Sequence, residues 1–566
     1  MNDIRRTILW VIFAFSLVML WDQWQVHNGR KATFFPSAST PAVTAASAPA
    51  SSVPAASSAL PATTAGASAV PATTPTEAAA TAPAASQPRE NIEVTTDVLK
   101  LVFDSEGGSV VRSEFLQHAE QGQPEQPVVL FDNSANRIYT AQSGLIGGPF
   151  PNHKTPMSFV GERQLAEGNN ELVLRFESPE QGGVRLNKIY TLKRGSYLVE
   201  VRHEVVNASG QTVTPQLYVQ LVRNNQQAPG GTAFYSTFTG PAFYTEAKKF
   251  QKVDFADIDK GKADFVTSSP DGWVAMVQHY FASAWLWPQP TQHENFARKV
   301  DNGLYAAGMI ASVGAVEPGS TRATDARLFV GPQEEKVLEA IAPGLELVKD
   351  YGYFTILSKP LYWLLDKLYA VIGNWGWSIV ALVLLLKILF YPLNAKAYAS
   401  MAKMKAINPK ITDMRERLKD SPQQMQQEMM RIYREEKVNP MGGCLPIMVQ
   451  IPVFIALYWV LLSSVEMRGA PWALWVQDLS AKDPYYILPI IMTLTTLFQT
   501  ALNPLPPDPM QAKLMWIMPL VFSVMFFLFP AGLVLYWITN NILTIAQQWL
   551  INTRMGVPPK FNLPKF

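Results

Sequence analysis

The stretch WSIVALVLLLKILFY, residues 377–391, is apolar throughout except at Lys387. A segment of this length and composition predicts a membrane-spanning helix. An ammonium group inside a bilayer costs about 2.5–3.5 kcal/mol on insertion scales, so an intramembrane lysine favours a functional role. Lys387 also lies about six residues, roughly 9 Å, from the predicted end of the span, and a lysine can reach the headgroups over that distance. Position alone leaves both interpretations open.

Four further apolar segments follow Lys387. The five predicted spans are residues 376–393, 443–463, 485–502, 514–529 and 533–551, and Lys387 is their only Asp, Glu, Lys, Arg or His. A sixth span is predicted within residues 1–25, where Arg5 and Arg6 precede an apolar run and Trp21 and Trp24 follow it. Because no small-x-small cleavage site follows that run directly, we interpret it as a retained anchor.

Charge distribution orients these spans. Residues 394–442 hold ten Lys and Arg residues, whereas residues 464–484 hold only Arg468 and Lys482. Cytoplasmic loops carry the excess of basic residues, so residues 394–442 and both termini, including a short tail of residues 552–566, are predicted to be cytoplasmic. The part of the chain between the anchor and the second span is then periplasmic.

The N-terminal half has a different composition. Residues 26–90 are rich in Ala, Pro, Ser and Thr, which predicts a disordered linker. Residues 91–345 contain short alternating segments separated by Gly, Pro, Asn and Asp, the pattern of an antiparallel β-sandwich. The predicted strands are residues 92–103, 171–176, 184–192, 197–206, 216–222, 303–310 and 326–330. The predicted fold class is therefore a multi-domain membrane protein, with a six-helix transmembrane part and a periplasmic β-sandwich.

Two helical elements are predicted at the membrane surfaces. Residues 350–375 are amphipathic and aromatic-rich, with Ser358 as a plausible N-cap and Pro360 in the first turn, and they fit an interfacial helix. Residues 394–442 fit a cytoplasmic hairpin of two helices, 396–418 and 423–436, the second of which starts with a capping-box layout at Ser421. The five-helix core that includes this hairpin is predicted to cover residues 376–551.

Polar residues of the last span form a candidate site. Asn540, Thr544, Gln547 and Gln548 share one helical face, Tyr536 lies one turn earlier, and Trp537 adjoins this face. Gln450 adds a polar group from another span. Such residues often hydrogen-bond helix to helix, but a whole stripe beside an unpaired lysine favours a hydrated groove.

The hairpin is dense in methionine. Its methionines include Met401, Met404, Met414, Met425 and Met429. Methionine surfaces adapt to partners of varied sequence, although packing within the hairpin is the simpler interpretation.

Several classes of protein find no support in the sequence. All six histidines precede the membrane half, which excludes a histidine metal site there and argues against a proton relay. The single cysteine, Cys444, rules out an intrachain disulfide, and no Walker-type loop is present. The balance of 47 Lys and Arg against 45 Asp and Glu gives no nucleic-acid signature. We therefore predict no cofactor, no metal, no catalytic residue and no direct nucleic-acid partner.

Several motifs of the membrane half resemble one family. They are YPL at 391–393, MAKM at 401–404, MRERL at 414–418, EKVNPMGGCLP at 436–446, DPYYILPI at 483–490, DPMQ at 508–511 and FPAGLVLYW at 529–537. Together they closely resemble the YidC/Oxa/Alb family of membrane-protein insertases, and the large periplasmic domain resembles its Gram-negative form. The resemblance covers nearly the whole chain apart from the linker.

The resemblance implies an insertase and chaperone of the bacterial inner membrane that is not an enzyme. It implies a hydrophilic groove open to cytoplasm and lipid, in which Lys387 takes the place of a cation that is usually arginine. Trp537 and Val383 take the places of a groove tyrosine and a groove threonine. The implied partners are nascent membrane proteins, lipids, the Sec translocon with its accessory components, and translating ribosomes.

Two other classes of function remain as alternatives. A secondary transporter would show repeat symmetry or intramembrane carboxylates, and neither is evident in the sequence. A membrane-tethered glycan-binding protein could stack sugars on Trp273, Tyr280, Trp285 and Trp287, although packing in a core is the more ordinary role for such residues.

Overall fold

The computed structural model describes residues 89–121, 123–226, 237–301, 303–418, 421–436, 445–503, 509–554, 556 and 561. The predicted anchor, nearly all of the predicted linker and most of the predicted tail lie outside the described residues. The chain divides into two compact units, Met1–Glu114 with Val129–Gly331, and Phe115–Val128 with Pro332–Phe566. We describe each unit by itself.

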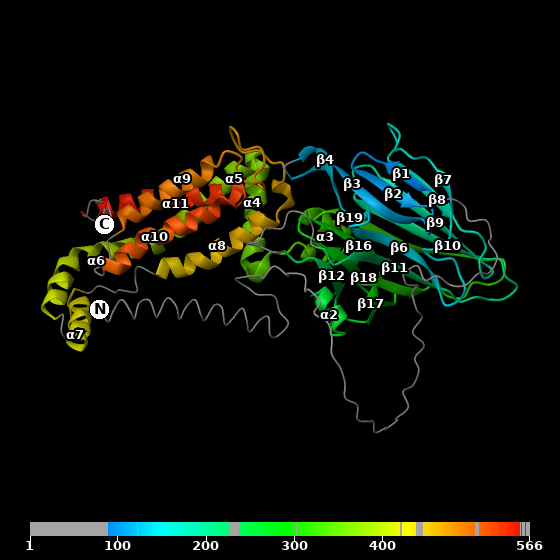
Figure 1. Ribbon diagram of the computed structural model, residues 1–566, viewed down its shortest axis with the longest axis horizontal. Coiled ribbons are helices and arrows are strands. Elements are labelled where there is room, and N and C mark those ends of the chain that lie inside the picture. The colour runs from blue at the N-terminus through cyan, green and yellow to red at the C-terminus, as the bar shows by residue number, and fades with distance from the viewer. Residues whose placement is uncertain are drawn as a thin grey trace, which may run out of the picture. The chain divides into compact units, whose positions relative to one another are not determined.

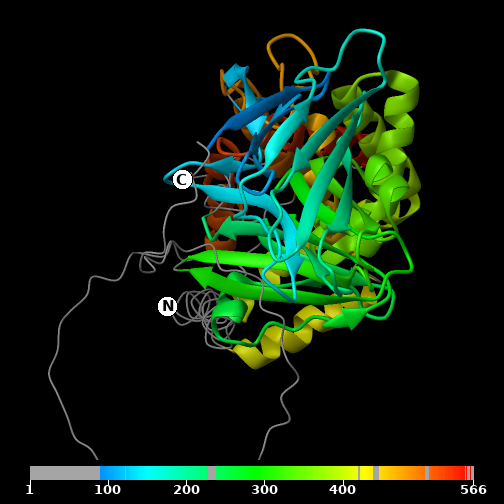
Figure 2. The ribbon, with the colours of Figure 1, turned by 90° about the vertical axis from the view of Figure 1, so that its right-hand side faces the viewer.

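The first unit is built from two antiparallel sheets (Figures 1 and 2). One sheet has the order β1-β2-β3-β6-β11-β18-β17-β14, with β4 paired to β3 and β5 to β6. Its strands are β1 (Asn91–Thr95), β2 (Leu99–Asp104), β3 (Ser109–Glu120), β4 (Gln123–Val129), β5 (Asp132–Asn133), β6 (Ile138–Ile146), β11 (Gln216–Asn224), β14 (Ser268–Ser269), β17 (His293–Asp301) and β18 (Leu304–Ser312).

The second sheet has the order β13-β12-β15-β16-β19-β10-β9-β8-β7. Its strands are β7 (Ser158–Gly161), β8 (Glu171–Glu177), β9 (Val184–Lys193), β10 (Leu198–Asn207), β12 (Gly240–Thr245), β13 (Lys249–Lys252), β15 (Trp273–Val277), β16 (Phe281–Leu286) and β19 (Thr321–Pro332). The predicted β-sandwich is confirmed. The expected strand 92–103 is two strands, because the chain turns between Thr95 and Leu99.

The inner faces of the two sheets meet in one core. Tyr139 on β6 hydrogen-bonds Ser283 on β16 over 2.7 Å, and the Trp285 indole donates to the Gln220 carbonyl over 3.1 Å. Trp273, Trp285 and Trp287 are each 1% exposed, and Tyr280 is 8% exposed. These aromatic residues pack in the core and do not present a surface on which a sugar could stack.

The second unit is helical. Its helices are α3 (Glu335–Ile341), α4 (Thr355–Ile372), α5 (Trp375–Leu389), α6 (Tyr391–Arg417), α7 (Pro422–Glu435), α8 (Leu445–Ser463), α9 (Ile487–Leu502), α10 (Pro509–Phe526) and α11 (Ala531–Arg554), with short 3₁₀ turns at Leu345–Val348, Gly352–Phe354 and Val465–Met467. The short helix α2 (Phe255–Asp259) belongs to the sandwich unit.

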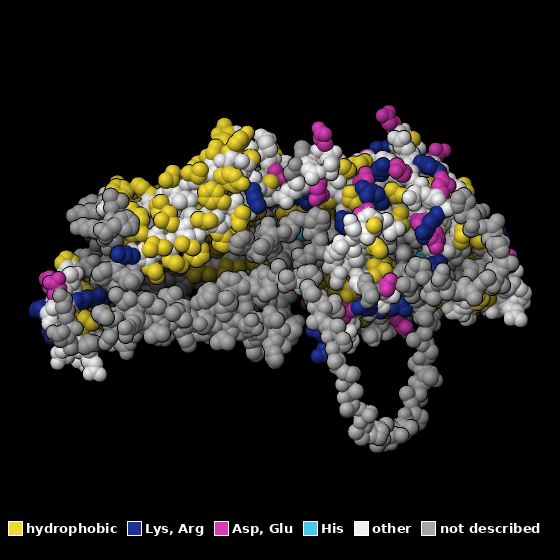
Figure 3. Space-filling model, viewed as in Figure 1, with side chains coloured by type: hydrophobic (Ala, Val, Ile, Leu, Met, Phe, Trp, Pro, Cys, Tyr) yellow, Lys and Arg dark blue, Asp and Glu magenta, His cyan; other side chains and the backbone are white. Residues whose placement is uncertain are grey.

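Helix α11 is central to this unit. It packs against α5, α6, α8 and α9, while α4 packs against α5 and α8 (Figure 1). Hydrophobic side chains gather on the outer surface of the helices (Figure 3). Among the most exposed are Ile388 (62%), Leu389 (69%), Leu494 (61%), Val521 (60%) and Val524 (69%). A large exposed apolar surface is what a lipid-facing bundle presents.

The predicted apolar spans correspond to helices α5, α8, α9, α10 and α11. By length and composition, no one helix in the described part of the chain suffices to cross a membrane, whereas Trp375–Leu389 and Tyr391–Ser400 suffice together across a 63° bend. The number of transmembrane helices therefore stays a prediction. The bend was not predicted from the sequence. It falls where Pro392 occupies the first turn of α6, a position in which proline starts a helix but cannot continue the preceding one.

The start of α4 differs from the prediction. The helix begins at Thr355, so Ser358 is inside it and Pro360 is beyond its first turn. Ser358 is fully buried, and its hydroxyl donates to the Ala456 carbonyl of α8 over 3.3 Å. A contact with a distant helix thus takes the hydroxyl that we expected to cap α4. Gly373 ends α4 with φ of 70°, and the Asn374 side chain caps α5, so two residues separate these helices.

The helical hairpin is present as α6 and α7. Ser421 is the N-cap of α7 and Pro422 is its first residue, as predicted, but the Ser421 side chain makes no capping hydrogen bond. Ile407, Ile411 and Met414 form the interior of the hairpin. The cytoplasmic position of the hairpin stays a prediction.

Candidate functional site

Lys387 lies in the last turn of α5 and is 5% exposed. Its ammonium donates a hydrogen bond to the Thr544 hydroxyl of α11 over 2.7 Å. That hydroxyl in turn donates to the Asn540 carbonyl, one helical turn earlier, over 2.6 Å. Among the described residues no carboxylate forms an ion pair with Lys387. A buried cation held by a neutral hydroxyl is poorly compensated, so it attracts any anion that can reach it.

Further hydrogen bonds join α11 to the helices around Lys387. Gln450 on α8 donates to the Asn540 side chain over 3.0 Å, and Asn394 on α6 donates to the Gln547 side chain over 3.2 Å. Gln547 donates to the backbone carbonyl of Lys387 over 3.0 Å. We call the residues Lys387, Asn394, Gln450, Asn540, Thr544 and Gln547 the polar cluster.

A small cavity lies within the polar cluster. Its volume is about 20 Å³, and its lining includes Val383, Leu386, Lys387, Phe390, Asn394, Gln450, Val453, Tyr536 and Asn540. A volume of that size holds about one water molecule. A polypeptide segment could enter only if the hydrogen bonds of the cluster opened and the helices separated.

The structure brings together most of the predicted site residues. A chain of hydrogen bonds links Lys387, Gln450, Asn540, Thr544 and Gln547, and Tyr536 lines the cavity. Trp537 does not line it. Its ring instead packs edge-on against Phe454, with centroids 4.6 Å apart, and against Phe526 at 4.9 Å.

The predicted polar stripe of α11 divides into two faces. Gln548 does not join the polar cluster but donates to Asn503, just beyond the end of α9, over 3.2 Å. Asn541 lies on the same side and donates to Thr496 of α9 over 2.8 Å. These bonds join helix to helix, the ordinary role of polar residues in apolar bundles. The sequence signal for this second face was the Asn540–Asn541 pair, since adjacent residues of a helix point about 100° apart.

Sequence reasoning missed Asn394. It is the first strongly polar residue after the apolar segment that contains Lys387, and it is 7% exposed. It lies one turn beyond the bend at Phe390, and this bend turns α6 towards α11. Its position could have been found only by predicting the bend.

Of the hairpin methionines whose side chains the structure describes, Met414 is buried, whereas Met425 and Met429 are half-buried. Met414 is 1% exposed, and Met425 and Met429 pack against the interior that it shares with Ile407 and Ile411. The side chains of Met401 and Met404 lie outside the described residues. The packing interpretation therefore holds for Met414 in this structure, and the capture role of the other methionines stays a prediction.

Fold and site together define an apolar helical bundle with a buried cation, attached to a β-sandwich. Two protein-family sequence models match the chain. The family model of the YidC periplasmic domain matches residues 91–364, and that of the 60Kd inner membrane protein matches residues 367–557. The membrane protein insertase YidC of Cupriavidus necator is 54% identical over 556 residues, which cover 98% of each chain. That of Burkholderia multivorans is 51% identical over 559 residues, which cover 98% of this chain and 99% of the relative.

A solved structure described as an active YidC insertase with its first transmembrane domain resolved is also similar. It has a TM-score of 0.38 and 18% identity, and the match covers 81% of this chain and 92% of the other. The chain belongs to the YidC family of membrane protein insertases. The resemblance seen in the sequence is confirmed, together with the function class, the inner-membrane location and the absence of enzymatic activity that it implied. Neither the transporter nor the glycan-binding alternative is favoured.

Proposed function

We propose that the polar cluster is the site where this insertase receives the polar part of a membrane-protein substrate. The observation that carries the proposal is Lys387, a cation inside an apolar bundle whose hydrogen-bonded side-chain partner is the neutral Thr544 hydroxyl. A substrate carboxylate would interact with this ammonium far more strongly than a hydroxyl does. Two unit charges 4 Å apart attract by about 4 kcal/mol at an effective dielectric constant of 20.

The other hydrogen bonds of the polar cluster are weak enough for a substrate to break them and separate the helices. Gln450 and Asn394 each bind α11, and Gln547 of α11 binds α5, through one hydrogen bond between neutral groups. Such a bond contributes about 0.5–1.5 kcal/mol. An entering polar segment can replace these partners one at a time. The apolar part of the substrate then moves into lipid, driven by about 25 cal/mol per Å² of apolar surface removed from water. No nucleotide is required.

The proposed topology places both termini and the α6–α7 hairpin in the cytoplasm and the β-sandwich in the periplasm. The basic residues of the hairpin and the scarcity of basic residues between α8 and α9 support it. The hairpin is then the first part of the core to meet a nascent chain, where Met401, Met404, Met425 and Met429 can contact it. Cooperation with the Sec translocon and with translating ribosomes follows from the resemblance and belongs to the same proposal.

The test compares insertion of two single-span substrates that differ only in the translocated tail, one with two Asp residues and one with two Asn residues. In proteoliposomes of full-length protein, Lys387→Ala should slow insertion of the acidic-tailed substrate at least tenfold and the neutral-tailed one much less. Lys387→Arg, which keeps the charge, should restore the acidic substrate. Lys367→Ala, which removes a lysine of α4 outside the polar cluster, is the matched control. Equal loss for both tails would contradict an electrostatic role of Lys387.

A further inference from the structure

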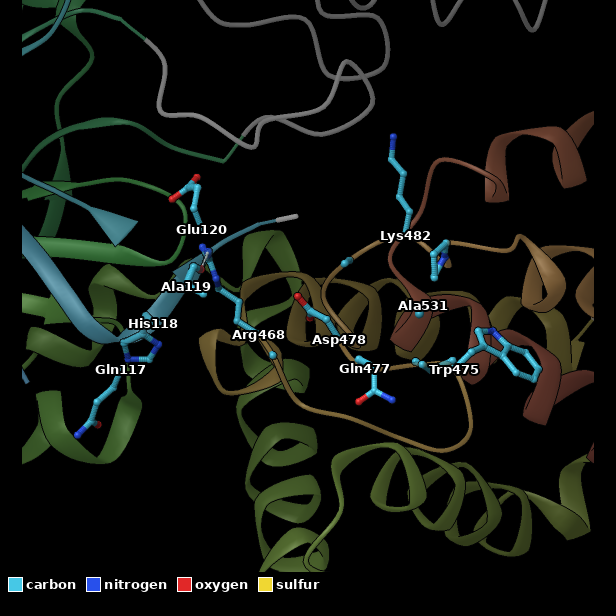
Figure 4. A pocket seen from close by; sticks show the side chains of 14 residues that line it. Gln117, His118, Ala119, Glu120, Arg468, Trp475, Gln477, Asp478, Lys482 and Ala531 are labelled. Carbon is cyan, nitrogen blue, oxygen red and sulfur yellow. Dashed lines mark hydrogen bonds between the residues drawn. The ribbon is translucent and has the colours of Figure 1, made fainter. Parts of the chain in front are cut away.

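The helical unit contains a second cavity, distinct from the polar cluster. Its volume is about 630 Å³, within the range of small-molecule sites. It lies between the end of β3 and the segment that joins α8 to α9 (Figure 4). Its lining residues are Gln117, His118, Ala119, Glu120, Arg468, Gly469, Trp475, Val476, Gln477, Asp478, Ala481, Lys482, Pro484 and Ala531. We call it the loop pocket.

Specific contacts build the walls of the loop pocket. Arg468 donates to the Ala119 carbonyl over 2.8 Å, and Gln121 donates to the Ser480 carbonyl over 3.0 Å, so the β3–β4 hairpin is attached to the α8–α9 segment at two points. Asp478 accepts two bonds of 2.8 Å from the backbone and hydroxyl of Ser480, both on Oδ1. Its carboxylate is directed towards the side of the pocket where Arg468 lies (Figure 4).

The charges in the loop pocket balance. Arg468 and Lys482 are cationic, and Glu120 and Asp478 are anionic. Burial and the neighbouring Arg468 lower the pKa of His118 to about 4, so this residue is neutral at physiological pH. A balanced set of charges suits a ligand that carries one positive and one negative group, and it disfavours a simple anion.

Three exposed apolar side chains lie within two residues, in sequence, of residues that line the loop pocket. Leu474 is 82% exposed, Tyr485 is 66% exposed and Tyr486 is 46% exposed, all within the segment that joins two apolar helices. Tyrosines at the ends of membrane spans lie at the level of the lipid headgroups. In the proposed topology, on which this step depends, the segment lies at the periplasmic surface of the membrane.

We propose that the loop pocket binds a phospholipid headgroup that carries a phosphodiester and a primary ammonium, as in phosphatidylethanolamine. Arg468 contacts the phosphate, and Asp478 and Glu120 accept hydrogen bonds from the ammonium. The acyl chains leave along Leu474 and Tyr485 into the outer leaflet. A bound lipid would thereby hold the β3–β4 hairpin and the α8–α9 segment together at the membrane surface.

The test measures lipid retention. Full-length protein is extracted from nanodiscs containing equal amounts of phosphatidylethanolamine, phosphatidylglycerol and phosphatidylcholine with identical acyl chains, and native mass spectrometry counts the retained lipids. The wild type should retain phosphatidylethanolamine several-fold over the other two. Asp478→Asn and Glu120→Gln should reduce this preference towards unity, and Arg468→Gln should lower retention of all three. Arg202→Gln, on the exposed face of β10, is the matched control and should behave as the wild type.

Soluble glycerophosphoethanolamine should displace the retained lipid, whereas inorganic phosphate at the same concentration should not. Equal retention of the three lipids by the wild type would overturn the proposal, and so would an unchanged preference in Asp478→Asn. Displacement by inorganic phosphate would indicate a simple anion site, and displacement by a peptide but not by glycerophosphoethanolamine would indicate a polypeptide site. Either result would also overturn the proposal. Because no insertion is measured, this outcome is independent of the test of Lys387.

Discussion

Lys387 could be recognised from the sequence as unusual, but its partner could not. Thr544 lies 157 positions away, and the hydrogen bond depends on how α5 packs against α11. From the sequence, Lys387 could either reach the lipid headgroups or serve a functional site inside the bundle. In the structure the side chain points into the bundle, which favours the proposed site over a contact with the headgroups.

Thr544 offers a prediction that is separate from the charge of Lys387. Thr544→Val keeps the shape of the side chain but removes the acceptor, leaving the ammonium buried without that bond. A hydrogen bond to a charged group contributes about 1.5–3 kcal/mol, so the bundle should be destabilised by about that amount. Insertion of acidic-tailed substrates should nevertheless persist, because Lys387 remains. Measurements of denaturation and insertion on the same preparation check both statements, and loss of insertion in a stable Thr544→Val protein would contradict them.

Buried bases in the β-sandwich predict a pH dependence of stability. His203 is fully buried and hydrogen-bonds the Ser143 hydroxyl over 2.9 Å. Burial, with nearby Lys188, lowers the pKa of His203 to about 3. The unfolded chain therefore binds a proton that the folded chain does not between about pH 6.5 and pH 3, so stability falls as the pH falls through this window.

In His203→Gln the fall in unfolding temperature between pH 6.5 and pH 4 should be smaller than in the wild type. Part of the remaining dependence comes from His153, whose pKa is lowered to about 3 by burial and nearby Lys188. Amide hydrogen exchange of β9 and β10 in the full-length protein follows the unfolding of the sandwich separately from that of the helical unit. If the unfolding temperatures of the wild type and of His203→Gln fell equally with pH, His203 would not be a source of the pH dependence.

At the scale of elements, the helices of the core were predicted well from apolar runs. A helix surrounded by lipid or protein needs apolar side chains, and these are visible in the sequence. The start of α4 and the bend between α5 and α6 were missed. Each depends on a contact that composition does not record, namely the bond from Ser358 to α8 and the packing of α6 on α11. The strands were predicted from alternation, and the order of the strands in each sheet could not be predicted.

Helix α4 is attached to the bundle by an ion pair. The fully buried Lys349 ammonium lies 3.0 Å from Glu466, in the 3₁₀ turn that follows α8, and 4.0 Å from the centre of the Tyr362 ring of α4. The Tyr362 hydroxyl donates to the same carboxylate over 2.6 Å. One lysine therefore joins the segment before α4, α4 itself and the turn after α8.

Lys349→Met should release α4, because it leaves Glu466 without its cation. Removing one partner of a buried pair costs about 3–5 kcal/mol. Amide hydrogen exchange in α4 should then be at least about 100-fold faster, since 1.4 kcal/mol corresponds to a factor of ten. Lys359→Met is the control, because the 3.5 Å pair of Lys359 with Glu346 is more exposed and contributes about 1 kcal/mol or less. Unchanged exchange in Lys349→Met would show that α4 is held by its apolar contacts alone.

At the scale of the whole molecule, the proposed topology can be tested with the single native cysteine removed. On a Cys444→Ala background, Lys482→Cys should react with a membrane-impermeant maleimide in spheroplasts, because the α8–α9 segment is predicted to be periplasmic. Lys410→Cys, on the hairpin, should react only after the membrane is permeabilised. The Cys444→Ala protein without a new cysteine gives the background. The reverse pattern of labelling would invert the proposed topology.

The central claim is that a substrate enters the polar cluster and meets Lys387. The most direct measurement is site-specific photocrosslinking of a stalled, acidic-tailed nascent chain from position 450, inside the cluster, with position 549 on the exposed side of α11 as the reference. The tail should crosslink to position 450 in the wild type, and this signal should fall strongly in Lys387→Ala while crosslinks of the apolar segment to position 549 persist. A tail that never reaches position 450, or that reaches it equally well without Lys387, would contradict the account.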